Sequence, residues 1–244
     1  MPRKPTASWP ASGTTAWCRS SATPARPWPG WARPTRPLAC RAMTPEFLYL
    51  ASQSPRRSQL LDQLGIAHRI LVADAAEEDA EALEAVRPGE APRSYVARVT
   101  GLKLDAAVAR MQKRGGPVAP VLCADTTVAM GRTIHGKPAD AQDAERMLAE
   151  LAGSTHRVLT AVAVQHGGQR FQALSESRVT FGPMTAAQIR RYVTGGEPMG
   201  KAGAYGIQGA AAAFVRQISG SYTGIMGLPL FETAGLLRAC GFEV

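Results

Sequence analysis

Residue types that could bind a phosphate group gather at residues 52–57, with the sequence Ser-Gln-Ser-Pro-Arg-Arg. Ser54 and the proline after it are typical of a helix start, so Arg56 and Arg57 would lie in the first helical turn. Cations there oppose the helix dipole at a cost of about 0.3 kcal/mol or more each, which an anion would offset. Free backbone N–H groups, both guanidinium groups and both serine hydroxyls could bind that anion. Alternatively, both arginines are solvated or pair with an acid such as Asp62.

A carboxylate suited to chemistry follows the run of small apolar residues at 118–124. This run predicts a buried strand with Asp125 at its carboxyl end, where open α/β sheets usually carry functional groups. Among Arg and Lys side chains the carboxylate would be ionised, so it could hold Mg²⁺ or orient a water. Glu77 could reach the same place as a second carboxylate. As alternatives, Asp125 could cap a turn, and Glu77 could be a solvated member of an acidic stretch.

Lys103, Lys137 and Lys201 are candidate point charges for a polyphosphate. Residues 131–137 and 195–201 both spell G-x-x-x-x-G-K, the pattern of a phosphate-binding P-loop. The next residue is Pro or Ala, however, and neither offers the hydroxyl that this motif places on Mg²⁺. The sequence therefore argues against a P-loop NTPase, while each lysine could still be an ordinary solvated surface residue.

An amide that could recognise a base edge belongs to Gln208, which lies in the sequence Ala-Tyr-Gly-Ile-Gln-Gly. Its side chain offers a paired donor and acceptor, although it could equally tie a loop to its own backbone. The four histidines show no H-x-x-H or H-E-x-x-H spacing, and no G-x-S-x-G motif occurs. Zinc hydrolases and Ser-His-Asp esterases are therefore disfavoured.

The periodicity of residues 43–244 predicts the elements that must position these side chains. We expect strands at 47–51, 70–72, 118–124, 157–165, 169–173, 177–181 and 213–218. We expect helices at 54–65, 92–111, 140–153, 185–193 and 229–239. Irregular or turn-rich segments are expected at 74–90, 126–138 and 195–209. This order is typical of an α/β fold with a mixed sheet.

The formal charge of +9 comes mostly from residues 1–42, which hold seven basic side chains, no acidic ones, all four Trp and eight Pro. Residues 43–244 hold 21 basic and 19 acidic side chains, a net charge of +2, and make no case for nucleic-acid binding. Because proline forbids the long helix of a transit peptide, we expect 1–42 to be a disordered extension upstream of a natural start at Met43. A basic arm that touches nucleic acid is the alternative.

Membrane and secretory signals are missing from the sequence. No apolar run reaches the roughly 18 residues of a membrane span, and 1–42 lack the apolar stretch of a secretory signal. Four cysteines without a C-x-x-C pair are too few for a disulfide framework. We therefore expect a cytoplasmic protein with reduced thiols, a folded domain at 43–244, and no membrane or nucleic-acid partner.

Together these segments resemble the Maf family of nucleoside triphosphate pyrophosphatases, from about Phe47 to the C-terminus. The resemblance rests on Leu-Ala-Ser-Gln-Ser-Pro-Arg-Arg at 50–57, Ala-Asp-Thr-Thr-Val at 124–128, His-Gly-Lys-Pro at 135–138 and Lys-Ala-Gly-Ala-Tyr-Gly-Ile-Gln-Gly at 201–209. It implies a mixed, elongated β-sheet flanked by helices, with a cleft between two lobes. It also implies cleavage between the α- and β-phosphates of a nucleoside triphosphate, a divalent cation (Mg²⁺ or Mn²⁺) and a homodimer.

The resemblance also implies roles for individual residues. Asp125 would be the proton acceptor and, with Glu77, a metal ligand. The phosphate-binding and catalytic shell would consist of Ser52, Arg57, Lys103 and Lys137. The positions associated with base choice match Arg56, Thr126 and Gln208.

The Asp-Thr-Thr and Ile-Gln-Gly forms resemble the subgroup that acts on dTTP and UTP. The implied activity is hydrolysis of these nucleotides to the monophosphate and pyrophosphate. The alternative is a nucleotide-binding inhibitor of septum formation without essential catalysis. The sequence departs from the family in the extension at 1–42 and in several extra residues within 74–90.

Overall fold

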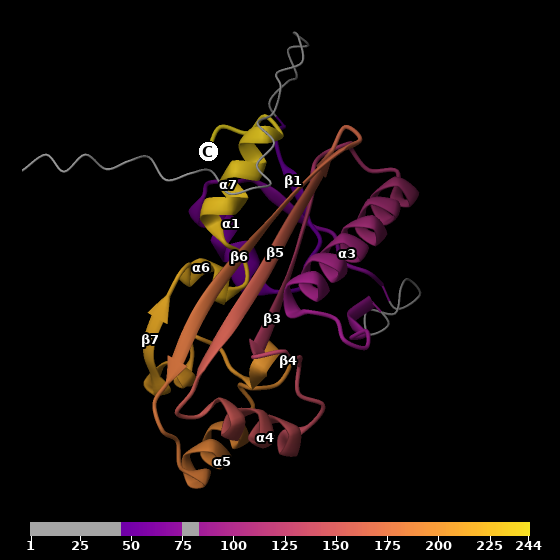
Figure 1. The fold of residues 1–244 in the computed structure, drawn as a ribbon. Coiled ribbons are helices and arrows are strands. Elements are labelled where there is room, and N and C mark those ends of the chain that lie inside the picture. Colours follow the sequence, from indigo (N-terminus) through magenta and orange to yellow (C-terminus); the bar gives the residue numbers. More distant parts are fainter. Residues whose placement is uncertain (1–44, 75–82) are drawn as a thin grey trace, which may run out of the picture. The chain divides into compact units, whose positions relative to one another are not determined.

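The computed structural model describes residues 45–74 and 83–244, whose strands form one mixed sheet (Figure 1). The order is β2-β1-β3-β5-β6-β7, with β4 paired to β3. The strands are β1 (Leu48–Leu50), β2 (His68–Ile70), β3 (Val121–Met130), β4 (Thr133–His135), β5 (Thr155–His166), β6 (Gln169–Phe181) and β7 (Val215–Ser219). Pairing of β1 with β2 and β3 is parallel and the other pairs are antiparallel, so the predicted mixed α/β class is confirmed.

Helices pack on both faces of this sheet. They are α1 (Pro55–Gln63), α3 (Pro92–Arg114), α4 (Ala141–Leu151), α5 (Ala186–Thr194), α6 (Tyr222–Met226) and α7 (Leu230–Ala239), with 3₁₀ turns η1 (Ala202–Ala204) and η2 (Ala210–Phe214). Along β3, Val121 and Cys123 pack with α3, while Leu122 and Ala124 face the larger core that includes α1 and α7. In the described residues no helix is both long and apolar enough to cross a membrane.

Several helices begin where the sequence predicts. Pro55 and Pro92 lie at the first positions of α1 and α3, where their missing N–H groups cost nothing. Asp140 accepts a 2.8 Å hydrogen bond from the Asp143 N–H at the start of α4. Thr185 and Gln188 form the predicted capping box of α5.

Strand β3 is longer than predicted, which changes where Asp125 lies. The sequence predicted a strand that ends at 124 and a turn-rich segment at 126–138, and this was wrong. The β-branched run Thr126-Thr127-Val128 favours extended backbone, and β3 continues through it to Met130. Asp125 is therefore in the middle of β3, and the strand that ends beside it is β1.

Other boundaries also differ from the prediction. Strands predicted at 169–173 and 177–181 are one strand, β6, because β5 pairs with it without interruption. Strand β2 covers His68–Ile70 rather than 70–72, and α6 was not predicted. The extension at 1–42 lies outside the described residues, so its prediction stays untested.

One edge of β3 has a gap in its pairing. Among the residues described, β1 pairs with Val121 and Leu122, and β4 pairs with Val128 and the residues after it, which leaves no partner strand between them on that edge. Asp125 and Thr126 lie in this gap. Because successive side chains of a strand point to opposite faces, a ligand at the open edge could reach both of these residues.

Gly203 connects two segments beside this gap, and its replacement tests the packing there. Its N–H donates to Gly136 O at 3.0 Å. Its φ is +69°, and an added Cβ would lie 2.8 Å from the nearest side-chain atom of Val128. We expect Gly203→Ala to lower the free energy of unfolding by about 3 kcal/mol, measured by urea denaturation. Gly235→Ala in α7, where an added Cβ meets nothing within 4 Å, should keep or slightly raise stability. Equal stability of both variants would contradict the packing described.

Candidate active site

A cleft of about 810 Å³ opens at the gap in β3. Predicted site residues that line it are Ser52, Arg56, Arg57, Lys103, Asp125, Thr126, Lys137 and Gln208. They come from α1 and the loop before it, from α3, from β3, and from the loops after β4 and η1. The predicted metal ligand Glu77 lies outside the described residues. Segments far apart in the sequence thus meet in one cleft.

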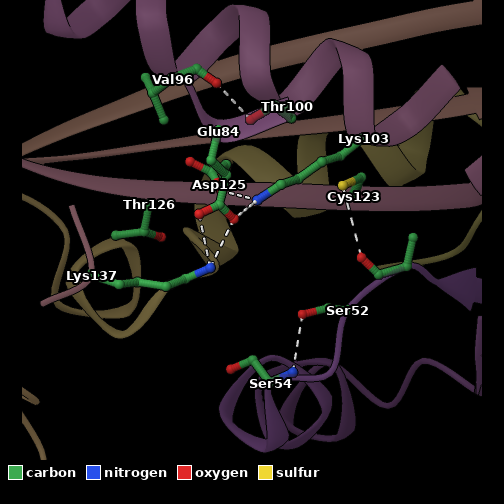
Figure 2. A network of polar contacts seen from close by, with 12 residues as sticks. Ser52, Ser54, Glu84, Val96, Thr100, Lys103, Cys123, Asp125, Thr126 and Lys137 are labelled. Carbon is green, nitrogen blue, oxygen red and sulfur yellow. Dashed lines mark hydrogen bonds and ion pairs between the residues drawn. The ribbon is translucent and has the colours of Figure 1, made fainter. Parts of the chain in front are cut away.

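The centre of the cleft is a cluster of alternating charges (Figure 2). Lys103 Nζ donates to Asp125 Oδ1 and to Glu84 Oε1, both at 2.6 Å. Lys137 Nζ donates to the two carboxylate oxygens of Glu84 at 2.8 and 2.9 Å. Asp125 is only 8% exposed. Lys103 from α3 therefore holds the two carboxylates close together, and Lys137 from the loop after β4 binds one of them, Glu84.

Pairing keeps the charges of this cluster in place. Burial alone would lower the pKa of Lys103, but Asp125 and Glu84 outweigh it, and the pKa is raised. Burial alone would raise the pKa of Glu84, but Lys103 and Lys137 outweigh it and hold the pKa below its ordinary value. Both side chains are therefore ionised at neutral pH.

Arg57 ties the start of α1 to distant parts of the chain. Its Nε donates to Gly227 O at 2.8 Å and its Nη1 to Ser52 Oγ at 3.0 Å. Ser52 Oγ also accepts the Ser54 N–H at 3.2 Å, whereas Ser54, at the N-cap position, makes no side-chain capping bond. Burial lowers the pKa of Arg57, while the nearby Asp125 charge opposes this shift. Arg57 thus remains charged and held in one orientation beside the cleft.

A second group of cations lies towards Gln208. Within the described part of the chain, Arg56 Nε is buried and has no hydrogen-bond partner. Burial lowers the pKa of Lys201, and the neighbouring Arg56 adds to the shift. Lys201 Nζ donates to Glu197 O. A buried donor without a partner beside a second cation favours an anionic or hydrogen-bonding ligand at this end of the cleft.

Sequence reasoning missed two residues of the site. Glu84 belongs to the acidic stretch before α3, where no motif separates it from its neighbours, and only its contacts with Lys103 and Lys137 single it out. Thr160 looks like an ordinary β-branched residue of a buried strand. Its hydroxyl nevertheless lies 2.9 Å from that of Thr126.

The fold and this cleft define a mixed α/β protein whose site suits a phosphorylated ligand, because cations surround paired carboxylates. The chain matches the family described as Maf-like protein over residues 47–240. It is 65% identical over 199 residues to the dTTP/UTP pyrophosphatase of Albidiferax ferrireducens, covering 82% of this chain and 99% of that protein. It is 64% identical over 199 residues to the dTTP/UTP pyrophosphatase of Polaromonas sp., covering 82% and 98%. The chain therefore belongs to the Maf family, as its motifs predicted.

The loop that carries Gln208 is anchored in the core by Tyr205. The Tyr205 hydroxyl lies 2.8 Å from His156 Nε2. The rings of His156 and Phe181 both make edge-on contacts with the Tyr205 ring. His156 is 1% exposed. Burial lowers the pKa of His156 to about 4, so the imidazole is neutral in the folded protein at neutral pH.

This neutral histidine gives stability a specific pH dependence. In the unfolded chain His156 takes up a proton near pH 6.5, but in the folded protein only near pH 4. The contribution of His156 to the free energy of unfolding is therefore fully present above pH 6.5. As the pH falls from 6.5 to about 4, the protein loses about 3 kcal/mol of stability from this group. His156→Gln should remove this part of the dependence in urea unfolding between pH 7 and 4.5. His166→Gln, at the end of β5, is the control, and parallel profiles for wild type and His156→Gln would refute the prediction.

Proposed function

We propose that this protein is a nucleoside triphosphate pyrophosphatase that converts dTTP and UTP to the monophosphate and pyrophosphate. The observation that carries the proposal is the buried Asp125 among Lys103, Lys137 and Arg57 in one cleft. The volume of about 810 Å³ suits a nucleotide-sized ligand. The names of the relatives, at 61 to 65% identity, support the choice of substrate.

The cationic side chains would bind and orient the phosphates. Lys103, Lys137 and Arg57 come from three separate elements and surround the gap in β3. As water attacks the α-phosphorus and the bond to the β-phosphate breaks, negative charge grows on the leaving pyrophosphate. Cations fixed around the gap stabilise this charge without reorganising.

Asp125 would accept the proton of the attacking water. Lys103 Nζ contacts Oδ1 of Asp125, so we assign Oδ2 to the water. This contact fixes the orientation of the carboxylate towards the attacking water, as general-base catalysis requires. The proton moves from water to Asp125, and the new P–O bond replaces the bond to pyrophosphate.

The carboxylates of Asp125 and Glu84 fit a divalent cation, Mg²⁺ or Mn²⁺. Mg²⁺ is typically bound by one or two carboxylates together with substrate phosphates and water. The part of the chain that is described offers no group of three or more His, Cys, Asp or Glu side chains that could hold a metal, so substrate oxygens and water would have to supply the other ligands. When bound, the cation would neutralise charge on the phosphates. We assign its second carboxylate to Glu84 in place of Glu77.

The base would be read by Arg56, Thr126 and Gln208, which line the same cleft and offer donors and acceptors. A homodimer stays a prediction from the family resemblance, and a cytoplasmic location stays a prediction from the missing membrane and secretory signals. The alternative, a nucleotide-binding inhibitor of septum formation without essential catalysis, requires that dTTP binds but that no pyrophosphate is released.

Replacing the proposed base tests the mechanism directly. We expect Asp125→Asn to lower kcat for pyrophosphate release from dTTP on the order of 1000-fold, because the amide cannot accept the proton. Binding of dTTP should persist in calorimetry, and thermal unfolding should stay cooperative. Asp105→Asn, which alters an exposed ion pair with Arg170 outside the cleft, is the matched control. Near-normal turnover by Asp125→Asn would remove Asp125 from its role.

The metal assignment is tested by titration. We expect Glu84→Gln to raise the Mg²⁺ concentration for half-maximal activity on the order of tenfold, because a charged oxygen ligand is lost. Glu150→Gln on α4, which changes a surface pair with Arg146, should leave the titration unchanged. A shift for Glu77→Gln but not for Glu84→Gln would return the second carboxylate to Glu77.

A further inference from the structure

A chain of hydrogen bonds connects the cleft to the interior through two threonines. Thr126 Oγ1, on β3 at the cleft, lies 2.9 Å from Thr160 Oγ1 on β5. Thr160 Oγ1 lies 2.7 Å from Gly224 O in α6. Arg57 Nη2 approaches Thr126 Oγ1 from the cleft side at 3.5 Å. Thr160 itself is 1% exposed.

The chemistry of these groups fixes the direction of the chain. A carbonyl oxygen only accepts, so the single hydroxyl hydrogen of Thr160 must point to Gly224 O. Thr160 can then only accept from Thr126, whose own hydrogen therefore points into the protein. Arg57 likewise can only donate to Thr126. Towards the cleft, Thr126 presents lone pairs and no hydrogen.

The surroundings prevent the chain from reversing. Thr160 is almost completely buried, so water cannot replace Gly224 O as the acceptor of its hydroxyl hydrogen. Helix α6 packs closely on β6, since a Cβ on Gly224 would lie 3.3 Å from Ser175 Oγ. Gly224 O, which also accepts the Gly227 N–H at 3.1 Å, lies 2.7 Å from Thr160 Oγ1. If the Thr160 hydrogen turned away, two acceptor oxygens would face each other at this distance without a hydrogen between them.

We propose, resting on the proposed function, that Thr160 is a positioning residue that makes Thr126 an obligate acceptor and so selects pyrimidines with a hydrogen on N3. Thymine and uracil carry that hydrogen, whereas N3 of cytosine is an acceptor. Opposite Thr126, cytosine N3 would bring two acceptors together and leave both without a partner. A site built to pair one polar group rejects the analogue that lacks it. Thr160 therefore sets substrate choice without touching the substrate.

The test compares the full-length wild type with three single variants on dTTP and dCTP. Thr160→Val keeps the shape but removes the hydroxyl, which frees the Thr126 hydroxyl to rotate and donate to cytosine N3. The ratio of kcat/KM for dTTP over dCTP should fall roughly threefold to tenfold, the effect of one neutral hydrogen bond. Thr160→Ser keeps the hydroxyl and should keep the ratio. Thr155→Val removes a hydroxyl from another threonine pair on β5, with Thr180, and is the matched control.

Each outcome separates this inference from the proposed function. No dTTP hydrolysis by the wild type would refute both. A wild type that hydrolyses dTTP, with an unchanged ratio in Thr160→Val, would overturn the role of Thr160 alone. A ratio that falls equally in Thr160→Ser would assign the effect to packing and also overturn it. If Thr160→Val does not fold, Thr160→Ala, which adds no bulk, takes its place with the same expected fall in the ratio.

Discussion

The pairing of Lys103 with two carboxylates is the interaction on which the site depends. Asp125 is almost buried, and Glu84 comes close enough to share the same ammonium group. Without that cation, the two negative charges would repel each other, and the carboxylates would not stay side by side in the cleft. The long helix α3 thus matters mainly because it carries Lys103 to the open edge of β3.

The gap in β3 exists because its parallel neighbour is short. Strand β1 ends at Leu50, and the chain then turns away into α1, so the backbone that would have covered Asp125 instead carries Ser52 and Arg57. Arg57 bonds to Gly227 O, which also fixes the loop before α7 against the cleft. The turn from β1 into α1 therefore leaves the edge of β3 open, places Arg57 beside it and, through Arg57, holds Gly227 in position.

Local signals predicted much of this arrangement, and long-range contacts account for the rest. Asp140 and Thr185 start helices through bonds to nearby backbone, so their sequence patterns were sufficient. The position of Asp125 depends instead on where β1 stops and β4 begins to pair, which no local pattern encodes. Glu84 was missed for the same reason, since only Lys103 and Lys137, 19 and 53 residues away, distinguish it from other acids in its stretch.

The pleat of β3 decides which neighbours Asp125 and Thr126 each contact. Asp125 and Thr126 are neighbours, yet they face opposite sides of the sheet, towards Lys103 on one side and towards Arg57 and Thr160 on the other. A slip of one residue in the pairing of β3 would exchange the two and place a hydroxyl among the lysines. The continuous pairing of β3 with β5, and of β5 with β6, prevents such a slip. The β5–β6 hairpin, although it carries no charge of the cluster, therefore keeps Asp125 on the face of Lys103 and Thr126 on the face of Arg57 and Thr160.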